Sequence, residues 1–248
     1  MRFVAFDMEI AKPVPDGADL LAGRPGIACA ALAREGAADP IVMFNPDVTP
    51  QWFDLDTKAM TLGGAAEILA ALEALTGQGD TIVTWNGAGF DFRLLADETG
   101  QHQACARLAL DSIDMMFQVL CERGHPLALD SALKGMALPS KVDQVTLANG
   151  ETVHVSGADA PRLWQAGEYL AVMTYCAGDV ERTLALAIAC QQRRHLAWIS
   201  QRGRRNEVSL GAGWLPVRRC LSLPLPDTSW MERPILREDV LKWTAPDS

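Results

Sequence analysis

Residues 81–95 read TIVTWNGAGFDFRLL, a strand pattern that changes into a helix pattern across a glycine-rich turn. The first five residues are β-branched or aromatic, which favours a buried strand. The turn occupies residues 86–89, and Asp91 then falls in the first turn of the helix. Because open α/β sheets place their functional sites at the carboxyl ends of strands, this stretch predicts an α/β fold with a site near Asp91.

The same two patterns recur through the rest of the chain. Strand patterns occupy residues 2–6, 27–33, 40–44 and 81–85. Helix patterns lie near residues 63–76, 90–98, 108–123, 129–136 and 161–193. They predict an α/β fold in which helices flank a mixed sheet. The chain has 248 residues, 49% of them hydrophobic, which is enough for the core of one large domain. We place this domain at residues 1–197 and a C-terminal extension, packed on it, at residues 198–248.

Two acids, Asp7 and Glu9, follow the strand pattern at residues 2–6 and end that strand. Residues two apart on a strand project from the same face, so both carboxylates are expected to point at one place. The pattern alone is weak, because a chain with 31 acidic residues contains about one Asp-x-Glu pair by chance. Two solvated acids in a loop are therefore an equally good interpretation of this stretch.

Tyr175 and Asp179 lie in the longest helix pattern, at residues 161–193. They are four residues apart, which places a phenol and a carboxylate on one face of the helix, together with Val172 and Arg182. Both lie outside the predicted core stripe, whose members recur at intervals of three and four residues. This stripe consists of Leu163, Ala166, Leu170, Met173, Ala177, Val180, Leu184 and Ala187. The alternative interpretation is a surface tyrosine beside a solvated aspartate.

The stretch at residues 81–95, which carries Asn86 and Asp91, also has an ordinary structural explanation. The helix dipole favours a carboxylate in the first helical turn, where Asp91 lies, and Asn86 is a common turn former. For the acids to be unrelated, the ordinary explanations of all three stretches must hold together, and their order along the chain must be accidental. The three stretches taken together therefore favour a single acidic site.

The three stretches resemble the motifs of a known family. Phe6-Asp7-Met8-Glu9 resembles the first motif of the DEDD superfamily of ribonuclease-H-like exonucleases. Asn86-x-x-x-Phe90-Asp91 and Tyr175-Cys176-x-x-Asp179 look like the second and third motifs of the proofreading exonuclease domain of family-B DNA polymerases. The resemblance covers about residues 1–190 and implies a ribonuclease-H-like fold. It also implies the tyrosine subclass (DEDDy), because the other subclass has a histidine where this chain has Thr174.

Two departures from the family pattern are visible. Ile10 stands where such enzymes often have a threonine, which affects a contact to the terminal nucleotide rather than the metal site. The chain also lacks the aspartate-bearing motifs of a family-B polymerase, and 248 residues are too few to hold one. We therefore expect a stand-alone nuclease.

The resemblance implies a two-metal 3′–5′ exonuclease that acts on single-stranded DNA, or on RNA, and releases nucleoside 5′-monophosphates. Asp7 would bridge both ions, and Glu9 and Asp179 would hold the ion that activates water. Asp91 would complete the site, partly through coordinated water, and Tyr175 would orient the attacking water. Ligands that are all carboxylates suit Mg²⁺ or Mn²⁺ rather than zinc. Residues near these acids are the expected substrate contacts, namely Met8, Asn86, Phe90 and Arg182.

The net charge of −9 opposes binding to a phosphate polymer, which prefers a basic surface. The charge is unevenly distributed, because residues 190–219 carry +6 and leave −15 for the rest of the chain. The arginines of this segment are Arg193, Arg194, Arg202, Arg204, Arg205, Arg218 and Arg219. They form either a basic patch that follows a nucleic-acid backbone or a solvated helix end and linker.

Three further features have two interpretations each. The Pro- and Gly-rich segment 11–26 is either a wall of the substrate groove or a plain connection. Segment 139–160 has the pattern of a β-hairpin around Asn149-Gly150, which either separates nucleic-acid strands or decorates a sheet edge. Four tryptophans either pin the extension onto the domain or form, with arginines, a platform for single-stranded nucleic acid. They are Trp198, Trp214, Trp230 and Trp243.

The six cysteines have no Cys-x-x-Cys spacing, and we expect reduced, buried thiols in a cytoplasmic protein. Asp7 and Glu9 interrupt any signal-peptide pattern, and no run of 18 apolar residues predicts a membrane span. The four histidines are isolated, so we assign none to a metal and expect no organic cofactor.

Three functions remain open at this point. The favoured one is a metal-dependent 3′–5′ exonuclease. The second is a nucleic-acid-binding or partner-recruiting module that keeps the fold without useful turnover. The third is a hydrolase of oligonucleotides only a few residues long, which would use the same site chemistry.

Overall fold

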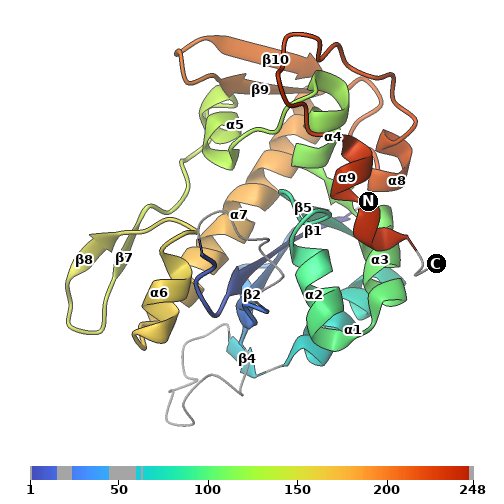
Figure 1. The fold of residues 1–248 in the computed structure, drawn as a ribbon. Coiled ribbons are helices and arrows are strands. Elements are labelled where there is room, and N and C mark those ends of the chain that lie inside the picture. Colours follow the sequence, from blue (N-terminus) through green and yellow to red (C-terminus); the bar gives the residue numbers. More distant parts are fainter. Residues whose placement is uncertain (1, 16–23, 45–59, 63, 246–248) are drawn as a thin grey trace.

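The computed structural model describes residues 2–15, 24–44, 60–62 and 64–245 (Figure 1). Its strands are β1 (Arg2–Ile10), β2 (Ile27–Arg34), β3 (Ile41–Phe44), β4 (Met60–Leu62), β5 (Asp80–Thr84), β6 (Ile113–Asp114), β7 (Gln144–Thr146), β8 (Thr152–His154), β9 (His195–Ile199) and β10 (Arg205–Ser209). Its helices are α1 (Ala65–Gly77), α2 (Asp91–Thr99), α3 (His102–Asp111), α4 (Met115–Arg123), α5 (Leu129–Gly135), α6 (Ala160–Gln165), α7 (Tyr169–Arg193), α8 (Val217–Cys220), α9 (Arg237–Val240) and the 3-10 helix η1 (Lys242–Thr244).

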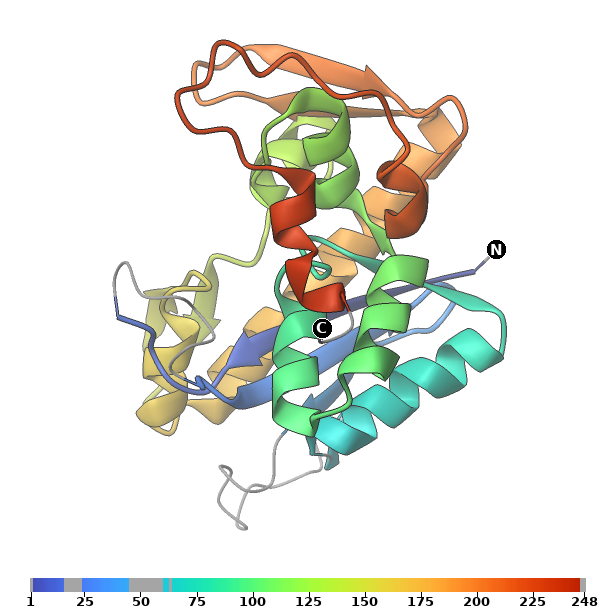
Figure 2. The ribbon, with the colours of Figure 1, turned by 45° about the vertical axis from the view of Figure 1, so that its right-hand side comes forward.

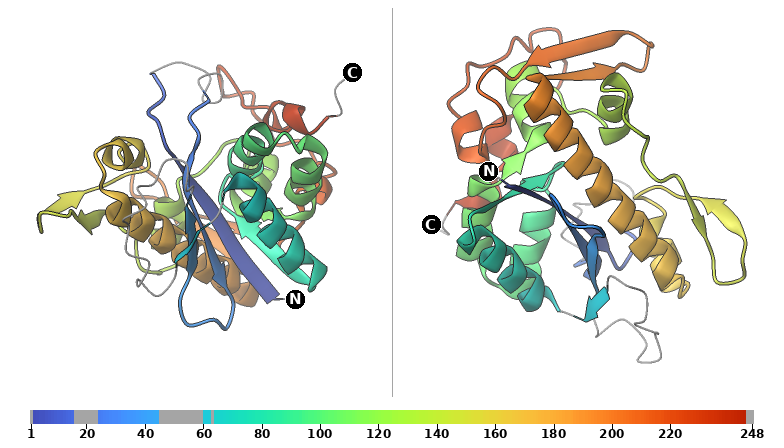
Figure 3. Two further views of the ribbon diagram at one scale, coloured as in Figure 1. Left: turned by 90° about the horizontal axis from the view of Figure 1, so that it is seen from below. Right: turned by 180° about the vertical axis from the view of Figure 1, so that it is seen from behind.

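Six strands form a mixed sheet in the order β4-β3-β2-β1-β5-β6. Strand β1 lies inside the sheet, antiparallel to β2 and parallel to β5. Strand β2 is also antiparallel to β3, whereas β3 and β4 are parallel, as are β5 and β6. Helices cover both faces of this sheet (Figure 3). The prediction of an α/β fold with a mixed sheet flanked by helices is confirmed.

The two faces of the sheet pack against different helices, and β1 supplies alternate residues to each face. Phe3 and Ala5 belong to the apolar cluster that includes α7, the long helix that crosses the sheet in the right-hand view of Figure 3. Val4 and Phe6 belong to the cluster formed with α1, α2 and α3. Because side chains alternate along a strand, odd-numbered positions of β1 face α7 and even-numbered ones face the other helices.

Strand β1 extends beyond the apolar run at residues 2–6, through Asp7 and Glu9, which were expected to end it, as far as Ile10. Its partner β2 is rich in alanine, is buried along nearly its whole length and pairs with β1 as far as Ile10. The register shifts only between Glu9 and Ile10. Asp7 and Glu9 therefore lie within a paired strand and not in the connection after it.

The prediction of one helix over residues 108–123 is wrong, because a short strand divides it. Helix α3 ends at Asp111, and Ile113 and Asp114 form β6 beside β5. Asp114 then caps α4, since its carboxylate accepts the N–H of Phe117 at 3.0 Å. A strand of two buried residues leaves no periodic signal, so the apolar spacing of this segment hides the break.

The helix predicted at residues 161–193 is likewise two helices, α6 and α7. Gly167 lies between them with a φ of +86°, the left-handed conformation that ends a helix. The helical phase begins anew at Tyr169, so Leu170 of the predicted core stripe is 49% exposed. Tyr175 and Asp179, expected to lie outside the core stripe, are buried at 2% and 5% exposure, so the alternative of a surface tyrosine beside a solvated aspartate is wrong.

The other predicted elements agree with the structure within two residues at each end. They are β2, β3, β5, α1, α2 and α5. The predicted hairpin around Asn149-Gly150 is present as β7 and β8. Part of segment 11–26, residues 16–23, lies outside the described residues.

The C-terminal part of the chain folds back over α4 and α5 (Figures 1 and 2). The β9–β10 hairpin packs on α5, α8 contacts α3 and α4, α9 contacts α4, and η1 contacts α3. Gly135 of α5 permits the first contact, because a Cβ there would lie 2.2 Å from the Cα of Trp198. The boundary predicted between residues 197 and 198 falls inside β9, so the extension is better counted from His195.

Three of the four C-terminal tryptophans hold this part of the chain in place. Trp198 and Trp214 are buried, and the indole N–H of Trp214 donates to the Ala187 carbonyl at 3.1 Å. The indole N–H of Trp243 donates to the Ala88 carbonyl at 2.8 Å, which ties the end of the extension to the turn before α2. Trp230 differs from the others, because it is 67% exposed.

The six cysteines are free and buried, as predicted. Among the described residues, no helix has both the length and the apolar character needed to cross a bilayer.

Candidate active site

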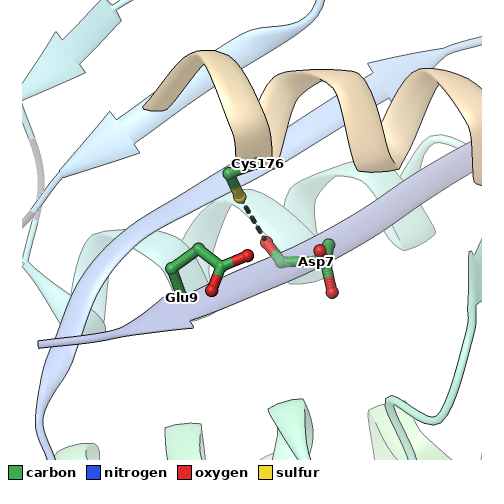
Figure 4. A group of neighbouring side chains, drawn as sticks. All are labelled: Asp7, Glu9 and Cys176. Atoms are coloured by element: carbon green, nitrogen blue, oxygen red, sulfur yellow. Dashed lines mark hydrogen bonds between the residues drawn. The ribbon is translucent and has the colours of Figure 1, made fainter. Parts of the chain in front are cut away.

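Two strand residues and one helix residue form the centre of the candidate site (Figure 4). Asp7 and Glu9 of β1 face helix α7, and the side chain of Cys176 points from α7 toward this strand. Ligand atoms of these three side chains all lie within 4.8 Å of one another. The alternation of side chains along β1 thus brings both acids to one place, which a loop would not do.

Cys176 stabilises the strand and is poorly suited to be a metal ligand. Its thiol donates to the Asp7 carbonyl at 3.7 Å. A hydrogen bond with Cys29 and burial raise the pKa of this thiol well above its ordinary value, so it stays protonated. The contact therefore fixes α7 against β1 at the position of the first acid.

Asp91 joins the site from the opposite face of the sheet. Its carboxylate accepts the backbone N–H of Met8, which lies between Asp7 and Glu9, at 2.9 Å. Asp91 is 2% exposed and is not among the residues that line the cavity described below. Burial raises its pKa to about 7, although the Met8 N–H favours the charged form.

Asp179 and Tyr175 lie one helical turn apart on α7, and Lys141 bridges them. The ammonium of Lys141 is 2.6 Å from Asp179 Oδ2 and donates to the Tyr175 hydroxyl at 3.1 Å. It also lies over the Tyr175 ring, 5.3 Å from the centroid. Lys141 was not found in the sequence analysis, because it comes from a connection that has no periodic pattern.

The site holds more negative charge than its cations balance. Burial raises the pKa of Asp7 well above its usual range, and the neighbouring Asp91 and Asp179 raise it further. Burial raises the pKa of Glu9 in the same way, with added repulsion from Asp7 and Asp179. Lys141 opposes both shifts, and burial still raises the pKa of Asp179 despite its contact with this lysine. A divalent cation would remove the repulsion that keeps these groups protonated.

One cavity of about 850 Å³ gathers most of the predicted site residues. Its polar lining comes from Asp7, Glu9, Tyr175, Asp179 and Lys141, among others. The predicted substrate contacts Met8, Asn86 and Phe90 also line it, and Trp85, Met116 and Pro161 add apolar walls. Pro13 and Val14 line it as well, so the described part of segment 11–26 does form a wall.

Arg182 is the predicted substrate contact that the structure places elsewhere. Its guanidinium donates to the Ser140 carbonyl at 2.9 Å, and Arg182 is not part of the cavity lining. Arg182 thus holds the residue before Lys141 and does not face the cavity.

The seven arginines of residues 190–219 are also absent from the described lining of the cavity. Several have other partners. Arg193 donates to the Met136 carbonyl at 2.6 Å, Arg205 pairs with Glu207 at 2.8 Å, and Arg218 pairs with Asp111 at 2.5 Å. These arginines therefore do not form a phosphate track at the acids themselves.

Gly178 sets the distance between α7 and the segment that carries Lys141. A Cβ at this position would lie 2.4 Å from Cγ2 of Val142, which is closer than packed atoms allow. Valine is stiff about its χ1 angle, so it cannot swing aside without moving its backbone. The absence of a side chain at Gly178 therefore allows Val142, and with it the neighbouring Lys141, to lie close to α7.

We expect Gly178→Ala to displace Lys141. Alanine gains about 1 kcal/mol of helix propensity, but overpacking costs about 1–3 kcal/mol, so the variant is slightly less stable. A misplaced Lys141 is expected to lower the turnover of any substrate by about 10- to 100-fold. Thermal unfolding and initial rates test this. Gly178→Ala with Val142→Ala is expected to recover the rate, and Gly77→Ala, where a Cβ meets open space, is the matched control.

Asp114 is a second residue that the sequence analysis missed. Besides capping α4, its carboxylate accepts the backbone N–H groups of Asn86 at 3.0 Å and Ala88 at 2.9 Å. It is 1% exposed, and Asn86 has a left-handed backbone with a φ of +73°. Asp114 thus fixes the turn between β5 and α2 that presents Phe90 and Asp91. The sequence signal that could have identified Asp114 is an acidic residue that follows an apolar one, Ile113, at the end of a strand.

Asp114→Ala is expected to destabilise the protein by about 3–5 kcal/mol, because it leaves three N–H groups without an acceptor, two of them buried and one part-buried. Urea unfolding measures the change. Asp111→Ala, which removes an exposed ion-pair partner of Arg218 from α3, is expected to cost less than about 1 kcal/mol. A cost below about 1 kcal/mol for Asp114→Ala would show that the turn does not depend on this carboxylate.

The residues present fit a hard divalent cation. The buried Oδ1 of Asp179 has no hydrogen-bond partner among the described groups, although its Oδ2 contacts Lys141. Buried polar oxygens are normally paired, so an unpaired one beside other carboxylates suits a cation. The available donors are oxygens, which Mg²⁺ and Mn²⁺ prefer, whereas the nearby sulfur is a protonated thiol.

No protein-family model matches this chain, and no curated protein matches it.

Proposed function

We propose that this chain is a metal-dependent 3′–5′ exonuclease of the tyrosine subclass of the DEDD superfamily. The observation that carries the proposal is the meeting of Asp7 and Glu9 of β1 with Asp179, Tyr175 and Lys141 at one cavity of about 850 Å³, with Asp91 bonded to the backbone between the first two acids. Buried like charges of this kind are costly, and active sites are where such arrangements occur. The mixed α/β sheet is compatible with the ribonuclease-H-like fold that the motifs imply.

Asp7, Glu9 and Asp179 would hold the metal directly, and Asp91 would support them through the Met8 N–H. A pair of Mg²⁺ or Mn²⁺ ions would stabilise both the attacking and the leaving oxygen in a displacement at phosphorus. The protein's own contribution is to hold the carboxylates in a buried cluster, where their charges interact strongly with a cation.

Tyr175 would orient the attacking water by hydrogen bonding. Burial and the charge of Asp179 raise the pKa of its phenol above its ordinary value, so the hydroxyl stays neutral and cannot act as a base. The hydroxyl accepts a hydrogen bond from Lys141, which leaves its own proton to be donated. Tyr175 thus suits a positioning role beside Asp179.

The cavity walls suit a nucleotide. Trp85 and Phe90 supply aromatic surface, and Met8 and Met116 supply adaptable apolar contacts. Aromatic side chains bind nucleobases by stacking, independently of their sequence. The indole N–H of Trp85 donates to the Leu127 carbonyl at 3.1 Å, so this ring has a fixed place in the wall.

Polarity and metal dependence test the proposal. The purified protein is incubated with a 5′-labelled single-stranded DNA, and with an RNA of the same sequence, in Mg²⁺, Mn²⁺ or chelator. We expect a ladder of shortened, still labelled products with metal only, and a rate about 10²-fold lower for Tyr175→Phe. Immediate release of the label as a mononucleotide would indicate the opposite polarity, and no product in either metal would leave the binding-module alternative.

One observation favours a second candidate, a hydrolase of very short oligonucleotides. None of the seven arginines of residues 190–219 is among the described residues that line the cavity. The cations among the described lining residues are Lys141 and Arg162, which are paired with Asp179 and Asp159, and a site with so few free cations gains little from a long substrate. Rates on dinucleotides that equal or exceed those on long strands would favour this candidate.

Lys141→Gln is expected to lower both activity and stability. Burial opposes the lysine charge, but Asp179 and Tyr175 outweigh that effect and raise its pKa, so it is charged at neutral pH. Its loss removes a cation beside the reacting phosphate, worth about 10²-fold in rate, and leaves Asp179 unpaired at a cost of about 1–3 kcal/mol. Lys141→Arg is expected to retain part of both. A Lys141→Gln variant with unchanged kcat would exclude a contact with the substrate.

A further inference from the structure

Trp230 is the large aromatic side chain that the C-terminal extension leaves outside its core. It is 67% exposed, yet its indole N–H donates to the Asp227 carbonyl at 3.1 Å, so its orientation is fixed. The edge of His125 meets its ring, with centroids 6.2 Å apart and planes at 74°. A ring that is held in place but not covered has a face available for stacking.

The surface around Trp230 combines aromatic rings with a cation. His125 also contacts the buried Trp198, with centroids 6.4 Å apart, and the guanidinium of Arg123 lies 5.8 Å from the Trp198 ring centroid. Arg123 is exposed and forms no ion pair with any residue that the structure describes. We call the set of Arg123, His125 and Trp230 the Trp230 surface.

The Trp230 surface is connected to the acidic cavity by one short segment. His125 lies in the connection between α4 and α5; Ala128, at the end of this connection, and Leu129 and Asp130, at the start of α5, line the cavity. Asp130 is five positions after His125, so their Cα atoms are at most about 18 Å apart. In Figure 2 the C-terminal segment runs beside the β9–β10 hairpin and then descends past α4 toward α2. A polymer whose end occupies the cavity can therefore reach Trp230 within a few repeating units.

We propose that the Trp230 surface binds an upstream nucleotide of a single-stranded nucleic acid whose 3′ end occupies the acidic cavity. A base stacks on Trp230, and Arg123 lies beside the backbone phosphates. This inference rests on the proposed function and specifies its substrate, a strand of several nucleotides and not a dinucleotide.

An exposed aromatic ring with an arginine nearby favours a nucleic acid over a protein partner. Base stacking on an aromatic side chain is worth about 1–3 kcal/mol, and arginine adds contacts to phosphate and to the ring faces. Apolar residues such as Leu225 are also exposed on the same segment, so self-association through this surface is a distinct outcome of the test.

Binding in chelator tests the inference without hydrolysis. Fluorescence anisotropy measures the affinity of the full chain for labelled oligothymidylates of three and of twelve nucleotides. Trp230→Ala is expected to weaken binding of the twelve-nucleotide strand by about 5- to 150-fold and to leave the three-nucleotide strand unaffected. Trp230→Phe is expected to recover most of the affinity, and Leu225→Ala, an exposed apolar neighbour, to change nothing. Arg123→Ala is expected to reduce the salt dependence of binding by about one unit.

The outcomes separate this inference from the proposed function. Equal affinity of Trp230→Ala and the unchanged chain for the longer strand, or no binding by either, overturns the inference. A dimer in light scattering that Trp230→Ala dissociates, with unchanged DNA affinity, overturns it in favour of self-association. Trp230-dependent binding without hydrolysis in any metal supports the surface while rejecting the nuclease. Hydrolysis that Trp230→Ala does not alter at either length supports the nuclease while rejecting the surface.

Discussion

Asp7→Asn is expected to abolish hydrolysis and, at the same time, to stabilise the metal-free protein. The activity falls by about 10³-fold or more, because a carboxylate at the centre of the proposed metal site is worth several kcal/mol in the transition state. The stability of the metal-free protein rises by about 1 kcal/mol above neutral pH, since a buried charge that repels Asp91 and Asp179 is gone. Thermal unfolding in chelator and rates in Mn²⁺ measure the two effects on one preparation.

Opposite changes in activity and stability distinguish a functional acid from a structural one. Asp97→Asn, an exposed acid on α2, is the matched control and is expected to change neither quantity. If Asp7→Asn destabilises the metal-free protein, its carboxylate serves the fold and the assignment of the site is wrong. Asp114→Ala provides the contrast, because we expect it to lose stability.

The second large effect is a pH-dependent stabilisation by metal. Burial raises the pKa of Asp91 to about 7 in the folded protein, against about 3.9 in an unfolded chain. Between these values the folded protein retains a proton that the unfolded chain has released, so stability falls as pH rises through this window. Asp7, Glu9 and Asp179 have pKa values shifted in the same direction. The metal-free protein is therefore expected to unfold at a lower temperature at pH 8 than at pH 5.

Asp80 does not account for this trend. Although burial opposes its charge, hydrogen bonds from Arg2 and Arg34 lower the pKa of this carboxyl below its ordinary value. The stability that it contributes is present above its unfolded pKa and is lost only as pH falls through the acid range. A decline between pH 5 and 8 thus reports on the raised carboxyl groups of the site.

Mg²⁺ or Mn²⁺ is expected to reverse the decline, because the ion binds the deprotonated acids. At about 100 times its dissociation constant a ligand adds about 2.7 kcal/mol, which raises the midpoint of a protein of this size by about 5–10 °C. The increase is expected to be larger at pH 8 than at pH 5 and to be lost in Asp7→Asn. Differential scanning calorimetry over both pH values measures it. Equal increases in the variant would place the metal elsewhere.

The sequence predicts the fold class and the acids because both depend on local patterns. Alternation along β1 determines that Asp7 and Glu9 share a face, and the turn after β5 carries Asp91 to the same edge. The four-residue spacing of Tyr175 and Asp179 is equally local. These residues can therefore be predicted from the sequence without knowledge of their neighbours in the folded protein.

The residues that the sequence does not predict depend on contacts between distant parts of the chain. Lys141 contacts Asp179, which is 38 positions away in the sequence, and lies in a connection without a periodic pattern. The need for glycine at position 178 becomes clear only from its close contact with Val142 in the folded protein. The predicted core stripe assumes one continuous helix, but the break at Gly167 changes which residues of α7 face the core. The burial of Tyr175 is therefore not predicted by the sequence. Trp230 differs from the other tryptophans only in its exposure, which the sequence does not encode.

The chemical identity of the first product tests the central claim most directly. A single-stranded DNA is incubated in Mn²⁺ with the unchanged protein and with Asp7→Asn, and the released mononucleotide is identified by mass spectrometry. The proposed acidic site predicts nucleoside 5′-monophosphates from the unchanged protein and none above background from the variant. Nucleoside 3′-monophosphates, or equal release by Asp7→Asn, would contradict hydrolysis at this cluster of carboxylates.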